Sequence, residues 1–179
     1  MIRSSYFRPI LTGFILALAL VQAAPTLAAQ RDVDLLQSYV GSWTGRGTMG
    51  SGDNEETVKC SLAVTSGNMP TRVQFNGRCA LAGGTVSLKG TMGFIEERNR
   101  FEAILNSDIT FLQGQTAIGR RSGSGIVFTM RPSNPDTNSD LDIAVDMALK
   151  SGIITVDAKV TDTASGNSTT AKVPLEKKS

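Results

Sequence analysis

The chain has 179 residues, a formal net charge of +2, 6% aromatic residues, two cysteines and no histidine. Without histidine it has no Ser-His-Asp or Cys-His catalytic system and no imidazole that could bind haem iron or zinc. We therefore expect a protein that is not an enzyme and that uses no metal and no cofactor.

Residues 1–29 are typical of a secretory signal peptide. Two arginines precede an apolar stretch, Ile10 to Val21, and a segment rich in small residues runs from Ala23 to Ala29. The stretch has about 12 residues, whereas a membrane-spanning helix needs ~20. We expect cleavage near Ala28 or Ala29, no membrane span in the mature chain, and a periplasmic or secreted product.

Residues 30–179 have the usual size of one domain, and no linker divides them. Without the two arginines of the signal, the 18 basic residues fall to 16 and equal the 16 acidic ones. This balance argues against electrostatic binding to nucleic acid or to anionic membranes. We predict a single domain with no nucleic-acid partner.

The first predicted element is a short helix over residues 32–40, with Asp32 or Asp34 as its N-cap. Its apolar residues at helical spacing are Val33, Leu36 and Val40. This helix is placed to plug one end of the structure that the following strands form.

Alternation of apolar and polar residues, typical of half-buried strands, runs through most of the remaining chain. In residues 140–150, DLDIAVDMALK, Ile143, Val145 and Met147 share one face and the aspartates share the other. About ten such segments follow one another through short turns, which predicts an all-β antiparallel meander of about 8–10 strands. A closed barrel is preferred over a two-sheet sandwich because closure hides both edge strands.

The two cysteines predict a disulfide. Residues 60–79 read as strand, turn, strand, and pairing Val64 with Phe75 puts Cys60 directly opposite Cys79. An exported protein meets oxidising conditions, so we expect the pair to be bonded.

Keeping the apolar faces in phase extends this register to other hairpins. The pairs it predicts are Phe94 with Phe101, Cys79 with Leu88, Trp43 with Val64, Met130 with Leu141, and Leu149 with Ile154. Three inward glycines, Gly47, Gly77 and Gly90, are expected to leave room beside the disulfide and to let the sheet bend. In residues 109–118, apolar residues fall on both faces of a predicted strand, so the register of this segment stays open.

A short helix, then Gly41-Ser42-Trp43 at the start of the first strand, then a meander resembles the Gly-x-Trp beginning of lipocalin-like (calycin) barrels of bacteria. The resemblance implies a barrel whose tryptophan closes the floor beneath an arginine from the last strand. The closing strands offer Lys159 and Lys172 in its place, so that part of the family pattern is missing.

The resemblance and the apolar interior together favour a protein that binds an apolar or amphipathic small molecule inside the barrel. The candidate lining residues are Trp43, Leu62, Phe75, Leu88, Met92, Phe94, Phe128, Met130 and Met147.

Three alternatives stay open. The same side chains can simply fill a closed barrel. The chain can also bind a periplasmic protein partner, as barrel-shaped bacterial inhibitors of secreted metalloproteases do with an N-terminal segment, here Gln30 to Leu36. The third is an envelope protein without a small ligand.

Overall fold

The computed structural model describes residues 27–52 and 54–178. The predicted signal peptide lies outside these residues except for Leu27, Ala28 and Ala29, which form the start of helix α1 (Leu27–Ser38). The eleven strands are β1 (Gly41–Ser51), β2 (Asn54–Ser66), β3 (Arg72–Leu81), β4 (Gly84–Ile95), β5 (Arg100–Ser107), β6 (Gln115–Ser122), β7 (Gly125–Met130), β8 (Ser133–Asn134), β9 (Ser139–Lys150), β10 (Ile153–Asp162) and β11 (Ser168–Lys177). Two 3-10 turns, η1 (Glu96–Arg98) and η2 (Thr110–Leu112), complete the described elements.

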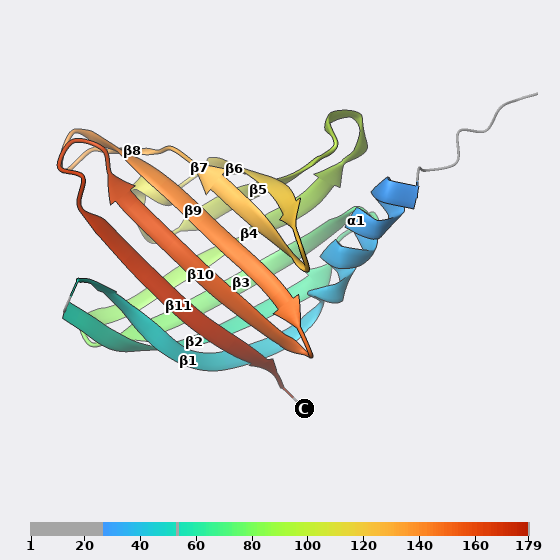
Figure 1. The fold of residues 1–179 in the computed structure, drawn as a ribbon, viewed down its shortest axis with the longest axis horizontal. Helices are drawn as coiled ribbons and strands as arrows, with labels where there is room; N and C mark the ends of the chain where they lie inside the picture. The colour runs from blue at the N-terminus through green and yellow to red at the C-terminus, as the bar shows by residue number, and fades with distance from the viewer. Residues whose placement is uncertain (1–26, 53, 179) are drawn as a thin grey trace, which may run out of the picture.

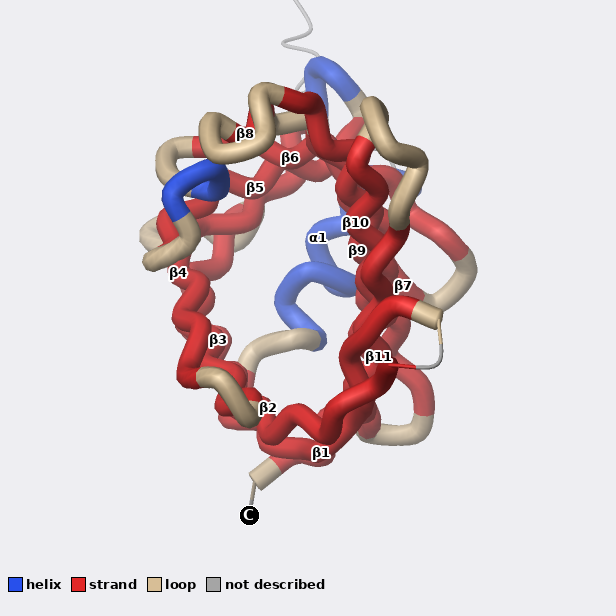
Figure 2. The backbone as a smooth tube through the Cα atoms, turned by 90° about the vertical axis from the view of Figure 1, so that its left-hand side faces the viewer, coloured by secondary structure: helices blue, strands red, loops and turns tan. Residues whose placement is uncertain are grey.

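Ten of these strands form a closed antiparallel barrel (Figures 1 and 2). Each strand pairs with the next along the chain, β7 pairs with β9, and β11 pairs with β1 to close the ring. The two-residue strand β8 only extends the edge of β9. The predicted barrel is confirmed, and the even strand number lets the first and last strands meet antiparallel.

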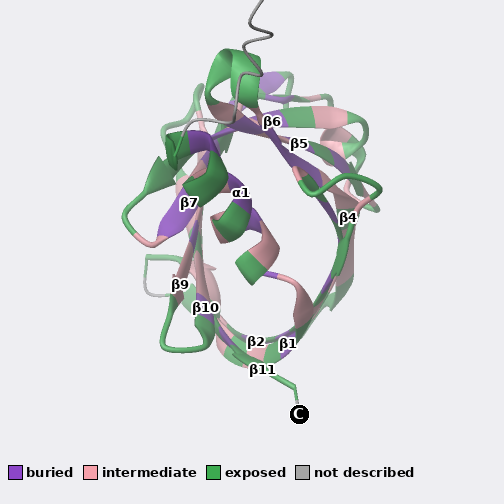
Figure 3. Cartoon of the chain, turned by 90° about the vertical axis from the view of Figure 1, so that its right-hand side faces the viewer, coloured by how far each residue is buried: buried purple, intermediate pink, exposed green. Residues whose placement is uncertain are grey.

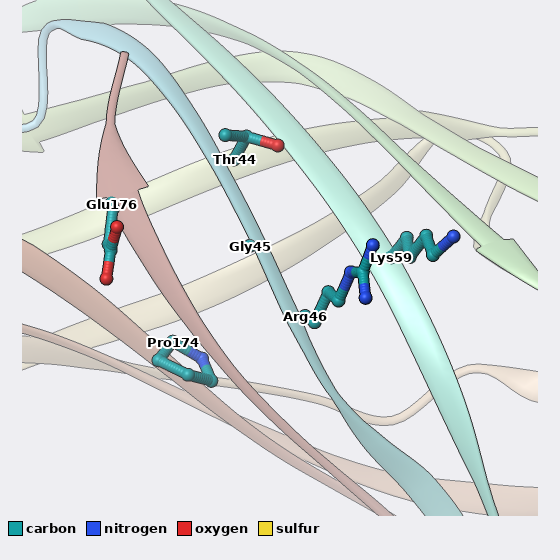
Figure 4. A pocket seen from close by; sticks show the side chains of 6 residues that line it. All are labelled: Thr44, Gly45, Arg46, Lys59, Pro174 and Glu176. Atoms are coloured by element: carbon teal, nitrogen blue, oxygen red, sulfur yellow. The ribbon is translucent and has the colours of Figure 1, made fainter. Parts of the chain in front are cut away.

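The seam between β1 and β11 depends on two glycines, of which Figure 4 labels Gly45. Pairing between the two strands skips Arg46 and Gly47, where Pro174 of β11 has no N–H to donate. A Cβ at Gly45 would lie 1.8 Å from the carbonyl oxygen of Pro174, and one at Gly47 would lie 1.9 Å from that of Lys172. Larger residues at these positions would push the first and last strands apart.

Helix α1 lies across one end of the barrel (Figures 2 and 3) and buries Ala29, Val33 and Leu36. The expectation that Asp32 or Asp34 caps the helix is wrong, because the helix begins five residues before the first of them. Asp32 instead accepts a hydrogen bond from Nε of Arg121 on β6 at 2.6 Å. This ion pair ties the helix to the barrel wall.

Two aromatic residues connect the helix to the barrel floor. Tyr39 is fully buried, donates its hydroxyl to the carbonyl oxygen of Met147, and accepts a 2.8 Å hydrogen bond from Nε1 of Trp43 on its own carbonyl. Burial, with a smaller contribution from the negative charge of Asp146, raises the pKa of Tyr39. The phenol therefore stays protonated and keeps its donor role.

A cation does lie over the floor tryptophan. Nζ of Lys177, at the end of β11, is 5.5 Å from the ring centre of Trp43. The lysines predicted for this place were Lys159 and Lys172, and Lys177 was not among them. The last strand runs almost to the end of the chain, so its final lysine reaches the position that the resemblance assigns to an arginine.

The predicted registers divide into two groups. Three predicted pairs are confirmed: Cys60 with Cys79, Phe94 with Phe101, and Leu149 with Ile154. Three others are wrong by two residues, because Cys79 pairs with Val86, Trp43 with Leu62, and Met130 with Ile143. A two-residue shift leaves every side chain on its own face, so the apolar pattern cannot detect it.

The ambiguous segment 109–118 has a simple explanation. Its first part forms η2, and the strand β6 begins only at Gln115. Ala117 then faces the core. The mixed parity arose because half of the segment is a turn and half is a strand.

Candidate functional site: the barrel interior

A cavity of about 290 Å³ lies inside the barrel, walled by every barrel strand except β1. Its lining consists of Cys60, Ser61, Leu62, Phe75, Gly77, Cys79, Val86, Leu88, Met92, Ala103, Leu105, Ala117, Phe128, Val145, Met147, Val156, Ala158, Ala171, Val173 and Leu175. No charged residue belongs to this lining, and Ser61 is its only hydroxyl-bearing residue.

Six of the nine residues predicted to line the interior lie at this cavity. They are Leu62, Phe75, Leu88, Met92, Phe128 and Met147. Sequence alternation finds them because inward-facing residues recur with period two along each strand.

The other three predicted residues lie elsewhere. Trp43 and Phe94 belong to the buried floor, where the ring of Phe94 packs 5.1 Å from that of Phe101. Met130 is half-buried against the core at the end of β7 that lies far from the helix. Alternation along a strand predicts whether a residue faces inward or outward, but it does not predict how far along the barrel axis the residue lies. That position decides which inward residues reach the cavity.

Small inward residues create the space; the alanines among them were not predicted, whereas Gly77 was expected to leave room beside the disulfide. Ala103, Ala117, Ala158 and Ala171 come from four different strands and all face the cavity. Gly77 joins them on β3. Alanines and glycines recurring at inward positions of several strands were the signal that could have predicted a hollow interior.

The disulfide Cys60–Cys79 is present and links β2 to β3 in the cavity wall, with a Cα–Cα distance of 4.1 Å. The described residues contain no free cysteine. Both sulfurs are therefore part of an apolar surface, and neither is available as a thiolate.

The end of the barrel beneath α1 is sealed. Four residues at this end have no more than 1% of their surface exposed: Leu36 and Tyr39 from the helix segment, and Val73 and Phe101 from the strands. The cavity residues toward the opposite end, which faces the viewer in Figure 2, are only half-buried, as at Val86, Ala158 and Ala171, so access to the cavity is left to that end.

Ionised groups lie outside the cavity. Hydrogen bonds from Arg100 and Arg98 lower the pKa of Glu102, and hydrogen bonds led by the hydroxyl of Ser139 lower that of Asp162. Within residues 27–52 and 54–178, no cluster of three or more His, Cys, Asp or Glu is arranged to hold a metal ion.

The segment Gln30 to Leu36, which a protease inhibitor would insert into its target, lies inside α1. Val33 and Leu36 are buried against the barrel, and Asp32 is paired with Arg121.

No helix in the described part of the chain combines the length and apolar character needed to cross a membrane.

Comparison with known proteins gives similarity of fold without similarity of sequence. No protein-family model and no curated protein sequence matches the chain. The structure of Rv2717c from M. tuberculosis superposes with a TM-score of 0.58 at 14% identity, covering 84% of this chain and 98% of the other. An S-type phycobiliprotein lyase, CPES from Guillardia theta, superposes with a TM-score of 0.53 at 8% identity, covering 84% of this chain and 97% of its own. Both likenesses concern the fold alone, and each covers 84% of this chain.

Proposed function

We propose that this protein is a non-enzymatic barrel that binds an apolar or amphipathic small molecule in its interior. The observation that carries the proposal is the cavity of about 290 Å³ with an uncharged, almost entirely apolar wall. Protein interiors are normally filled to the density of organic crystals, so a void of this size forfeits many contacts. A bound apolar group would restore them.

The size of the cavity limits the ligand. An engineered apolar cavity of ~150 Å³ accommodates benzene, so this one suits an apolar moiety on the order of ten carbon atoms. An alkyl chain or a fused ring system of that size would meet Phe75, Phe128 and the flexible side chains of Met92 and Met147. A larger amphiphile would leave its polar part outside.

The proposed compartment agrees with the disulfide, which favours an oxidising environment outside the cytoplasm. We place the protein in the periplasm or among secreted proteins, as the N-terminal sequence predicts. In such an aqueous compartment, an apolar molecule needs a carrier that hides it from water.

Two leucines placed in the cavity test the proposal. Ala158 and Ala171 pair directly across β10 and β11, and both face the cavity. The double variant Ala158→Leu/Ala171→Leu adds about six carbon atoms to a space for roughly ten. We expect it to lower the affinity for 1-decanol by at least tenfold, measured by titration calorimetry or by displacement of a fluorescent naphthylamine dye.

A matched control is Ala80→Leu, because Ala80 is exposed on the outer face of β3. It should leave decanol affinity unchanged. Native mass spectrometry of gently purified protein adds a second measurement, in which a co-purifying small molecule should be retained by the control and absent from the double variant. Equal decanol affinity in both variants, or no binding of decanol by the unmodified protein, would contradict the proposal.

A further inference from the structure

The cavity has no place for the polar part of an amphiphile. Its wall lacks charged side chains, and the end beneath α1 is sealed by buried residues such as Leu36 and Phe101. Leaving a polar group in that floor without partners would be costly. The head group of a bound amphiphile must therefore project from the opposite end of the barrel.

We call this opposite end the mouth and define it by the loops that the antiparallel order brings there: residues 51–52 with 54–56, then 82–83, 106–114, 131–142 and 162–167. The charged residues of the mouth are Glu55, Glu56, Asp108, Asp136, Asp140, Asp142, Asp162 and Arg131. Seven are acidic and one is basic. Nε of Arg131 is already bonded to Asp142 at 2.6 Å, so the remaining charge of the mouth is negative.

Two of these carboxylates continue the inward-facing rows of their strands. Glu56 lies on the same face of β2 as Val58 and Cys60, and Asp162 lies on the same face of β10 as Ala158. Hydrogen bonds from Ser139 and the loop after β10 keep the pKa of Asp162 low, so it is ionised at neutral pH. Negative charge therefore lies in line with the cavity wall.

The charges of the barrel are separated from end to end although the described chain is nearly neutral overall. No lysine lies in the described mouth, whereas Lys150, Lys177 and Lys178 all lie at the α1 end. A head group at the mouth is surrounded mainly by carboxylates and a head group at the other end would not be. A head group at the mouth would therefore meet mainly negative charge.

Building on the proposed binding function, we infer that the ligand is an amphiphile with a cationic head group, such as an amine or a quaternary ammonium, and not a fatty acid. The apolar part fills the cavity and the cation lies among the carboxylates of the mouth. Each attraction across water is weak, but several add at low ionic strength and weaken as salt shortens the screening length to below ~10 Å.

Three decyl compounds that share one chain test this inference: decyltrimethylammonium and decanoate, each used below its micelle concentration, and 1-decanol, used below its solubility limit. At 20 mM salt and pH 7, we expect the ammonium to bind roughly tenfold more tightly than decanoate, with decanol between them. The difference should shrink to less than about threefold in 0.5 M salt. Titration calorimetry or dye displacement gives the three affinities.

A charge-reversal variant localises the effect. The side chains of Glu55 and Asp136 take part in no hydrogen bond or ion pair of the described residues, so Glu55→Lys/Asp136→Lys should fold normally. It should lose most of the preference for the ammonium and keep its affinity for decanol. The control Glu96→Lys/Glu97→Lys makes the same charge change in η1 at the α1 end and should keep the preference.

The outcomes separate this inference from the proposed function. If decanol binds but decanoate binds as tightly as the ammonium, the cationic head group is refuted and the apolar binding site stands. If the mouth variant and the η1 control lose the preference equally, the mouth is not its source and the inference fails. If none of the three compounds binds, both the inference and the proposed function are refuted.

Discussion

Gly90→Ala and Gly77→Ala place the same methyl group on the inward face of neighbouring strands, and we expect different results. At position 90, a Cβ would lie 2.0 Å from the carbonyl oxygen of Ile104 and 2.8 Å from the ring of Phe75. At position 77, the nearest atom would be the carbonyl oxygen of Leu88 at 3.6 Å, an ordinary contact. Alanine therefore fits at position 77 and displaces both backbone and ring at position 90.

The magnitudes follow from this difference. Overpacking costs about 1–3 kcal/mol, and the entropy lost by the unfolded chain on Gly→Ala replacement returns ~0.5 kcal/mol. We expect Gly90→Ala to lower the free energy of unfolding by about 0.5–2.5 kcal/mol and Gly77→Ala to leave it unchanged or raise it by ~0.5 kcal/mol. For a domain of this size, the first value corresponds to a fall in Tm of roughly 1–10 °C.

Urea unfolding followed by circular dichroism measures both variants against the unmodified protein. The m-values should not change, because the surface exposed on unfolding stays the same. If Gly90→Ala is as stable as Gly77→Ala, the close approach of β4 to Ile104 and Phe75 does not limit this position, and the reasoning is refuted.

Two further predictions concern the disulfide and a mouth carboxylate. Cys60→Ala/Cys79→Ala should lower the free energy of unfolding by about 3 kcal/mol, because the bond joins residues 19 apart in sequence and restricts the unfolded chain; a loss below ~1 kcal/mol in thermal unfolding would count against this. Hydrogen bonds from Ser139 and Ser165 hold the folded pKa of Asp162 below its ordinary value. Their contribution to the free energy of unfolding is therefore fully present above about pH 3.9 and is lost as the pH falls through the folded pKa. Asp162→Asn should therefore show a smaller loss of stability than the unmodified protein in urea titrations from about pH 5 down to about pH 2, and equal losses would contradict the assignment.

The registers show where sequence reasoning succeeds and where it stops. Cys60 opposite Cys79 was correct because two cysteines must come within bonding distance, which fixes one register and excludes its neighbours. Trp43 opposite Val64 was wrong because only apolar parity supported it, and the observed partner, Leu62, lies two residues away on the same face. A covalent constraint specifies a register, whereas alternation specifies only a face.

The prediction of the cavity residues had the same limit, because alternation specified only the face of each residue. Alternation placed Leu62, Phe75 and Met147 inside the barrel, where they line the cavity. It also placed Trp43 and Phe94 there, but these belong to the floor beneath the helix. The position of a residue along the barrel axis depends on strand tilt and on the stagger between strands, neither of which is local to one segment.

The sequence by itself determined the class of fold, the short helix before the first strand, the disulfide and the apolar character of the interior. These properties depend on residue type and on spacing within one segment or one hairpin, where local geometry is sufficient. Only the tertiary structure decided that the sheet closes into ten strands, that small residues from several strands meet to leave a cavity, and that carboxylates from distant loops gather at its mouth. Each of these depends on residues far apart in the chain, which become neighbours only when the last strand pairs with the first.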